Sequence, residues 1–280
     1  MNIQEAINRA NSFLKLSNIK SSELDSEILM SEVIKKDRAY VILNSKEKLK
    51  KNKLNQFYRL IRQRSIGKPI AYLIGKKEFW KYEFNIKEGV LIPRPDTEII
   101  IEETLKVVKN KSKLKILDIG IGSGCLLLSI LKERKDFSGV GIDISQICLD
   151  ISKINSLKLG LKNRVKFFKS NVDNFDYGKY DLIVSNPPYI KKLDLNYLED
   201  DVVNFEPKLA LDGGFEGISE IRKVIYKSSE LIKKNGKLIL EIAFDQKDKV
   251  KEILKEEGFY INKVIKDLAN KDRCIISTKI

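Results

Sequence analysis

The 280-residue sequence predicts an α/β fold in which helices cover a mainly parallel sheet, preceded by a small all-α helical bundle and a linking β-hairpin. Three observations predict this fold. Apolar residues recur at helical spacing up to about residue 75. From residue 95 onward, strand-like apolar runs alternate with helical patterns, which is typical of parallel sheets. A glycine-rich turn joins the first of these runs to a helix.

The first 78 residues are expected to form the helical domain. Apolar positions share one helix face within 3–14, 24–33 and 54–61, and Ser21-Ser22 before acidic residues is a plausible helix start. Residues 79–94 alternate between apolar and polar, with Gly89 at a turn, and are expected to form the hairpin linker. Residues 95–280 form the α/β domain.

Helices and strands are expected to alternate through the α/β domain until two long strands joined by a tight link. The expected helices span 96–109, 124–134, 145–159, 217–234 and 246–256. The expected strands span 114–119, 138–143, 164–169, 180–185, 236–242, 259–265 and 273–279.

Composition excludes several kinds of chemistry. The chain has no histidine, which removes Ser-His-Asp, Cys-His and His-based zinc sites. Cys125, Cys148 and Cys274 lie far apart, so we expect small core residues in a reducing compartment and no metal site. Neither a signal peptide nor an apolar run of the ~20 residues that span a bilayer is evident. We therefore expect a cytoplasmic, monomeric enzyme that does not bind membranes.

The formal net charge is +14, and the first 90 residues carry 19 Lys and Arg against 10 Asp and Glu. Two causes stay open. Nucleotide bias in the encoding genome enriches lysine on solvated faces. A basic surface, densest at 46–64, could instead steer the protein toward an acidic partner or RNA. The charge alone neither requires nor excludes nucleic-acid binding.

The glycine-rich turn follows an apolar strand and precedes an apolar helix. Gly120, Gly122 and Gly124 allow positive φ and a close approach of the backbone to a ligand. The next strand ends in Asp143, and an acid there accepts both hydroxyls of a ribose. The alternatives are an ordinary βα turn and a helix N-cap.

A further strand ends in Asn186-Pro187-Pro188-Tyr189. The prolines cannot donate to a sheet ladder and stop the strand sharply. The Asn186 side chain and the Pro187 carbonyl then offer two hydrogen-bond acceptors beside the flat Tyr189 ring. Such a clamp suits a planar NH2 group, either an amide or the exocyclic amine of a base. The alternative is a proline-capped strand with a surface loop.

These motifs resemble class I methyltransferases that use S-adenosylmethionine to methylate nitrogen, which have a Rossmann-like, seven-stranded sheet with an antiparallel last strand. Five further segments narrow the resemblance to the release-factor glutamine methyltransferases (the HemK/PrmC family). These segments are 67–75, 78–80, 92–98, 205–211 and 266–273. The resemblance implies transfer of a methyl group to N5 of the glutamine in the Gly-Gly-Gln motif of class I peptide chain release factors, in translation termination.

The resemblance also implies site residues. The implied catalytic residues are Asn186, Pro187 and Tyr189. The implied cofactor-binding residues are Asp118, Gly120, Ile121, Gly122, Ser123, Gly124, Asp143, Asn171, Val172 and Asn186. The implied substrate-binding residues are Arg94, Glu98, Asn186, Pro187, Pro188 and Tyr189. Asn171 stands where relatives often carry an aspartate, and Arg94 to Glu98 could simply be a helix start with proline at its first position.

Two other functions fit parts of the sequence. An N-methyltransferase acting on adenine or guanine in DNA or RNA would use the same clamp, but it needs a target-recognition domain that is not evident after Tyr189. A non-catalytic binding module would retain the fold, but it would have no need of the glycine turn, Asp143 and Asn186 together.

Overall fold

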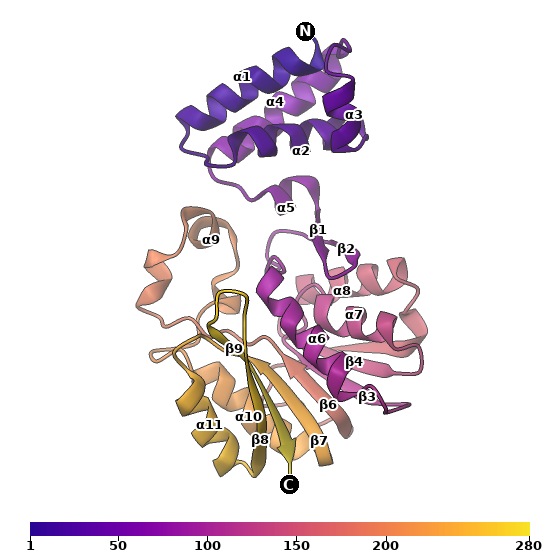
Figure 1. The fold of residues 1–280 in the computed structure, drawn as a ribbon, viewed down its shortest axis with the longest axis vertical. Helices are drawn as coiled ribbons and strands as arrows, with labels where there is room; N and C mark the ends of the chain where they lie inside the picture. The colour runs from indigo at the N-terminus through magenta and orange to yellow at the C-terminus, as the bar shows by residue number, and fades with distance from the viewer. The chain divides into compact units, whose positions relative to one another are not determined.

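A computed structural model describes all residues from Met1 to Ile280. Contacts within the chain define two compact units (Figure 1). One is helical and contains Met1–Lys76 together with Glu199–Phe205. The other, of α/β type, contains Lys77–Leu198 and Glu206–Ile280. The sequence placed the boundary two residues later, and it gave no sign that the chain re-enters the helical unit at Glu199.

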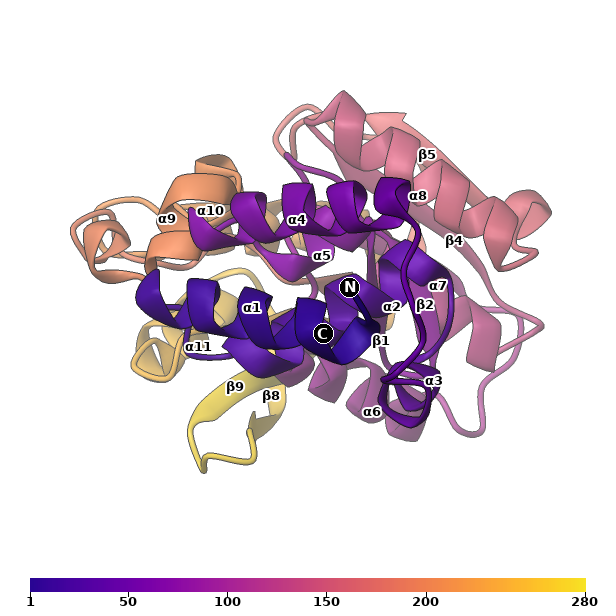
Figure 2. The same cartoon turned by 90° about the horizontal axis from the view of Figure 1, so that it is seen from above.

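The helical unit is built from amphipathic helices. Its members are α1 (Ile3–Leu16), α2 (Ser22–Ile34), α3 (Arg38–Leu43), α4 (Lys51–Ser65), α5 (Ile70–Ile74) and α9 (Asp200–Phe205). The first helix starts at a capping box, in which Asn2 and Glu5 satisfy each other's backbone N–H groups. Helices α1, α2 and α4 pack against one another (Figure 2). Leu14, Met30 and Phe57 are buried in the core of this unit. A buried ion pair joins α2 to α4, because Arg64 Nε donates to Asp25 Oδ2 at 2.7 Å.

The α/β unit contains a two-stranded and a seven-stranded sheet. Its strands are β1 (Lys76–Phe79), β2 (Tyr82–Asn85), β3 (Lys115–Ile119), β4 (Ser138–Asp143), β5 (Val165–Lys169), β6 (Tyr180–Ser185), β7 (Ile232–Glu241), β8 (Phe259–Lys266) and β9 (Asp272–Lys279). Its helices are α6 (Glu98–Val107), α7 (Cys125–Glu133), α8 (Gln146–Lys158), α10 (Ser219–Leu231) and α11 (Lys247–Glu256), with short 3-10 turns η1 (Pro95–Thr97), η2 (Lys162–Arg164), η3 (Asp194–Tyr197) and η4 (Lys208–Ala210).

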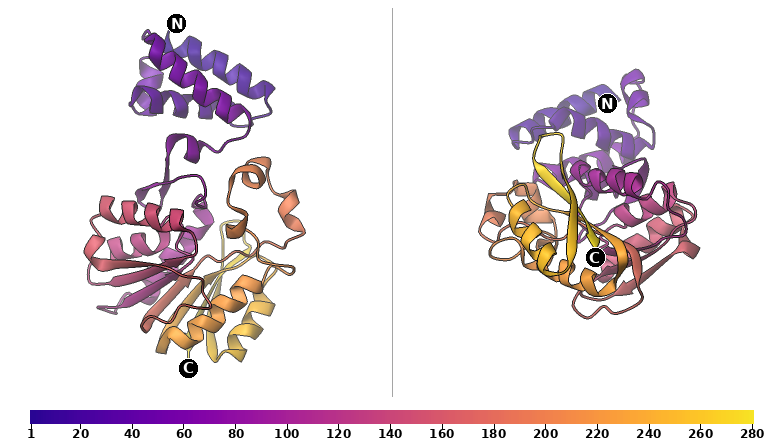
Figure 3. Two further views of the ribbon diagram at one scale, coloured as in Figure 1. Left: turned by 180° about the vertical axis from the view of Figure 1, so that it is seen from behind. Right: turned by 60° about the horizontal axis from the view of Figure 1, so that its bottom comes forward.

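The strand order of the large sheet is β5-β4-β3-β6-β7-β9-β8. All neighbouring pairs from β5 to β7 are parallel, and β9 runs antiparallel to both of its neighbours. Helices α6, α7 and α8 lie on one face of this sheet, and α10 and α11 lie on the other (Figure 3). The expected class I methyltransferase fold with an antiparallel last strand is confirmed.

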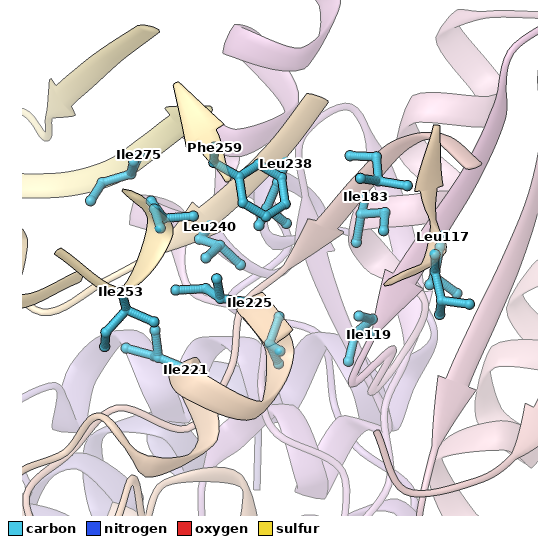
Figure 4. Packing of buried hydrophobic residues seen from close by; sticks show 14 of the residues in the cluster. Leu117, Ile119, Ile183, Ile221, Ile225, Leu238, Leu240, Ile253, Phe259 and Ile275 are labelled. Atoms are coloured by element: carbon cyan, nitrogen blue, oxygen red, sulfur yellow. The ribbon is translucent and has the colours of Figure 1, made fainter. Parts of the chain in front are cut away.

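The main core lies between the seven-stranded sheet and helices α10 and α11. Leu238 and Leu240 of β7 pack with Ile221 and Ile225 of α10 and with Ile253 of α11 (Figure 4). These side chains are almost fully buried, which stabilises the fold by roughly 1.5–3 kcal/mol for each large apolar side chain. None of the helices is both long and apolar enough to cross a membrane.

The hairpin prediction was wrong in position. The hairpin strands are β1 and β2, and residues 90–92 form no strand. Those residues are apolar for another reason: Val90 is buried against Cys148 and Ile151 of α8, and the backbone N–H of Ile92 donates to Glu206 Oε2 at 3.1 Å. Helix α10 also ends three residues before the expected position, and β7 begins at once with Ile232 paired to Tyr180.

Candidate active site

A pocket of about 270 Å³ opens at the carboxyl ends of the central strands. The chain leaves β3 toward β4 and β5 on one side and returns to β6 on the other, so the strand order reverses beside β3. Ligands bind at such reversal points in open α/β sheets. The lining includes Gly120, Gly122, Asp143, Val172 and Asn186, which four separate segments supply.

The glycine turn forms one wall through its backbone. Gly120 and Gly122 have φ of 77° and 55°, and a Cβ at either position would meet no atom within 4 Å. Their backbone therefore faces open space in the pocket. Gly124 has a different role: it lies outside the lining, precedes α7 at φ 83°, and its Cβ would come within 2.8 Å of Leu128. Ile121 and Ser123 also line the pocket.

Asp143 at the end of β4 holds the glycine turn. Its Oδ2 accepts a hydrogen bond from the N–H of Gly122 at 2.9 Å, and its Oδ1 accepts one from Ser145 at 2.9 Å. Burial raises the pKa of this carboxyl, and the two backbone donors oppose that effect. Asp143 also lines the pocket, so the residue that fixes the turn borders the space in which a ligand could bind.

Asp118 lies behind the glycine turn and does not line the pocket. It is 1% exposed, its Oδ2 accepts from the N–H of Leu127 at 3.3 Å, and its Oδ1 has no partner. Burial raises its pKa to about 7. A buried carboxylate oxygen without a partner is costly to keep ionised, which agrees with the raised pKa.

The segment after β6 places Asn186, Pro187 and Pro188 in the pocket wall. Asn186 Nδ2 donates to Thr97 Oγ1 at 3.1 Å, which leaves Oδ1 as an acceptor. Tyr189 lies outside the lining, half-buried, and its hydroxyl donates to Glu241 Oε1 at 2.9 Å. Burial raises the pKa of the Tyr189 hydroxyl, with Glu241 as a second cause, so the phenol stays protonated.

The segment 94–98 contributes to the site unevenly. Arg94 lines the pocket and pairs with Glu206 at 2.5 Å. Glu98 does not line it, because its Oε1 accepts from the backbone N–H of Trp80 at 2.7 Å and closes the turn of the hairpin. Asn171 is exposed and caps its own turn by accepting from Asn174, whereas Val172 lines the pocket.

Sequence reasoning missed two buried residues beside Asn186. Thr97 is 3% exposed at the end of η1, and Glu241 is 1% exposed at the end of β7. Thr97 lies within the segment 92–98, which carries part of the family resemblance. The only sequence feature that marks it is a hydroxyl side chain between Asp96 and Glu98. Glu241 carried a clearer signal, since a lone acid closes the apolar run Leu238-Ile239-Leu240.

The pocket residues fit a nucleoside cofactor. The wall at Gly120 and Gly122 has room for a ligand against the backbone, and Asp143 supplies a carboxylate that can accept ribose hydroxyls. Asp118, whose Oδ1 is buried without a partner, lies outside this lining. Asn186 lines the same pocket, and its Oδ1 is left as an acceptor.

Two family models match the chain. The PrmC N-terminal domain matches residues 5–75, and the methyltransferase small domain matches residues 97–204. Among solved structures, a methyltransferase from Pyrococcus furiosus has a TM-score of 0.54 at 17% identity, covering 80% of this chain and 98% of that one. That likeness shows the fold alone.

Curated relatives match the chain along its whole length. The release factor glutamine methyltransferase of Clostridium acetobutylicum is 38% identical over 282 residues, covering 100% of this chain and 99% of the relative. That of Buchnera aphidicola subsp. Schizaphis graminum is 39% identical over 279 residues, covering 100% of both. The chain therefore belongs to the release factor glutamine methyltransferase family.

Proposed function

We propose that this protein transfers a methyl group from S-adenosylmethionine to the side-chain amide nitrogen of the glutamine in the Gly-Gly-Gln motif of class I peptide chain release factors. The observation that carries the proposal is the orientation of Asn186. Its Nδ2 is bonded to buried Thr97, so its Oδ1 is the atom available to a substrate NH2 group. Family membership supports the choice of an amide over the amine of a base.

Gly120, Gly122 and Asp143 would hold the cofactor, with Ile121, Ser123 and Val172 as apolar and polar wall contacts. Asp118 would favour a positive charge at the cofactor's amino-acid end. S-adenosylmethionine supplies a methyl group on a sulfonium, which is transferred in line to a nucleophile. The chain's own residues must supply the rest: a site for the amide, its orientation and the exclusion of water.

An amide nitrogen is a weak nucleophile because its lone pair is delocalised into the carbonyl. Asn186 Oδ1 and the Pro187 carbonyl would accept both N–H bonds of the glutamine and direct the nitrogen at the methyl carbon. As the N–C bond forms and the bond from the methyl carbon to the sulfonium sulfur breaks, with its electron pair staying on sulfur, positive charge develops on the nitrogen, and these acceptors stabilise it more than they stabilise the ground state. The proton then leaves the nitrogen, and no general base near pKa 7 is required.

Tyr189 would help to fix the position of the segment that carries the two acceptors, Asn186 Oδ1 and the Pro187 carbonyl. Its hydroxyl is bonded to Glu241 and it lies outside the pocket lining. Arg94, held by Glu206, lies at the pocket wall, where its charge can meet polar groups of the incoming polypeptide. We assign substrate recognition to residues 1–78 as well, on the basis of their match to the PrmC N-terminal domain and their excess of basic residues.

The test is methyl transfer from labelled S-adenosylmethionine to a purified, unmethylated class I release factor. The control substrate is the same factor with its Gly-Gly-Gln glutamine changed to alanine. Label on the unaltered factor alone is the expected result. Label on duplex DNA or ribosomal RNA instead would overturn the proposal and make the basic segment 46–64 the substrate-binding surface. The reaction belongs in the cytoplasm, where release factors act.

A further inference from the structure

The side-chain amide of Asn186 can act as a clamp in only one of its two orientations. Its Oδ1 accepts hydrogen bonds and its Nδ2 only donates them. A substrate NH2 group also donates, so an inverted Asn186 would place donor against donor. Whatever fixes the direction of this amide therefore decides whether the site can bind its substrate.

Two buried residues are connected to the segment that carries Asn186, and one of them, Thr97, itself lines the pocket. Thr97 Oγ1 accepts from Asn186 Nδ2 at 3.1 Å. Glu241 Oε1 accepts from the Tyr189 hydroxyl at 2.9 Å, and its Oε2 is buried without a partner in good hydrogen-bond geometry. The Thr97 hydroxyl is nevertheless close enough to Glu241 to favour its ionised form. Thr97 thus lies between the amide and a carboxylate.

A carboxylate imposes a direction on these contacts. It has no hydrogen to give, so a hydroxyl that meets it must donate its single hydrogen. Thr97 can then only accept a hydrogen bond from Asn186, so the group of Asn186 that contacts it must be the donor, Nδ2. Burial is the largest influence on Glu241 and raises its pKa, nearby Asp96 acts in the same direction, and the hydroxyls of Thr97 and Tyr189 and the charge of Arg273 on β9 lower it. Arg273 is itself held by Asp267 at 2.9 Å.

We propose that Thr97 and Glu241 are positioning residues that fix the Asn186 amide with Oδ1 toward the substrate nitrogen. The inference rests on the proposed function, because it takes Asn186 as the residue that binds the reacting NH2 group. It adds the residues that act through Asn186 and the direction of the hydrogen bonds between them.

The first test compares Thr97→Val with Thr97→Ser. Valine keeps the shape of threonine and removes the hydroxyl, whereas serine keeps the hydroxyl. With release factor as substrate, Thr97→Val is expected to lower kcat about 100-fold and to leave the Kd for S-adenosylmethionine within about twofold. Thr97→Ser is expected to recover most of the lost turnover. The amide of Glu241→Gln can donate to the Thr97 hydroxyl, so the hydroxyl is free to donate to Asn186 and no longer fixes the orientation of the Asn186 amide. This variant is expected to lower kcat at least tenfold.

Thr104→Val is the matched control. Thr104 is 0% exposed on α6, and its hydroxyl has no hydrogen-bond partner, so valine there removes the same atom without breaking a contact. Its kcat and melting temperature are expected to match those of the wild type. Full turnover in Thr97→Val, an equal loss in Thr97→Val and Thr97→Ser, or a parallel loss of cofactor affinity would overturn the inference in favour of simple packing.

A second readout needs no substrate. In the ligand-free protein, exchange of the Asn186 side-chain amide hydrogens with solvent can be followed by ¹⁵N NMR, with the signal assigned from its loss in Asn186→Ala. Slow exchange in the wild type and in Thr97→Ser, with fast exchange in Thr97→Val, is expected. Unchanged exchange in Thr97→Val would overturn the inference. If the wild type methylates no release factor, the proposed function fails, but this readout still decides whether Thr97 holds the amide.

Discussion

Two buried carboxylates, Asp118 near the carboxyl end of β3 and Glu241 at the carboxyl end of β7, are satisfied in different ways. Each is 1% exposed, each has one oxygen without a partner, and burial raises the pKa of each. Asp118 accepts from a backbone N–H nine residues away, within one βα unit. Glu241 accepts from the Tyr189 hydroxyl, 52 residues away.

This difference reflects how the two sides of the pocket are built. The side around Asp118 and the glycine turn, here called the cofactor side, comes from one local stretch of chain, whereas the side around Asn186 comes from segments far apart in the sequence. The cofactor side consists of one strand, one turn and one helix start, and its geometry follows from glycines and backbone amides. The Asn186 side joins η1, the end of β6, the end of β7 and β9 through side chains. A change on the first side should alter binding, and a change on the second should alter turnover.

The largest expected effect is on stability, in Asp118→Asn. The ordinary pKa of this carboxyl is 3.8, and in the folded protein it is about 7. The folded state therefore keeps a proton that the unfolded chain loses, so wild-type stability falls as pH rises between about 4 and 7. Full linkage over that shift is about 4 kcal/mol. Asparagine mimics the protonated acid and should remove this decline.

Urea unfolding of wild type and Asp118→Asn between pH 4.5 and 8 measures the effect. The free energy of unfolding of the variant is expected to rise relative to the wild type as pH increases. Glu241→Gln is expected to change in the same direction, since burial raises that pKa as well. Parallel pH profiles for wild type and Asp118→Asn would show that Asp118 stays ionised in the folded protein.

The next largest effect is on turnover, in Asn186→Ala. This variant removes the acceptor for the substrate NH2 group, and the expected loss in kcat is about 10²–10³-fold. The Kd for S-adenosylmethionine, measured by calorimetry, should stay within about twofold. Equal losses of turnover and of cofactor affinity would mean that the two sides of the pocket do not act separately.

Asp143→Ala should show the opposite pattern. The carboxylate holds Gly122 and Ser145 through two charge-assisted hydrogen bonds, each worth about 1.5–3 kcal/mol in a buried setting. Its loss frees the glycine turn and removes an acceptor for the ribose. We expect Kd for S-adenosylmethionine to rise about 10–100-fold, with a smaller change in kcat at saturating cofactor. A fall in kcat with unchanged Kd would place Asp143 on the catalytic side.

This division also explains what the sequence could predict. Strands such as β4 and β6 have the expected bounds, because apolar runs and sharp strand ends mark them. The glycine turn and Asp143 share one βα unit and its neighbour, so their proximity follows from topology. Glu241 and Thr97 meet Tyr189 and Asn186 only through tertiary packing, which no short spacing encodes. Glu98 was expected to bind substrate, but its side chain accepts a hydrogen bond from the backbone of Trp80, a tertiary contact that the sequence does not reveal.

The smallest expected effect compares two neighbours on the cofactor side, Asn171 and Val172. Val172 lines the pocket, and Val172→Ala removes two methyl groups, each worth about 0.8 kcal/mol when buried, so the loss of one or both contacts corresponds to a roughly four- to fifteenfold weaker Kd for S-adenosylmethionine. Asn171 is exposed and bonded to Asn174, so Asn171→Ala should change Kd by about twofold at most. Titration calorimetry of both variants checks the pair. A larger loss of affinity in Asn171→Ala than in Val172→Ala would show that the Asn171 side chain turns into the pocket when the cofactor binds. The cofactor side would then depend on side-chain rearrangement as well as on the backbone of the glycine turn.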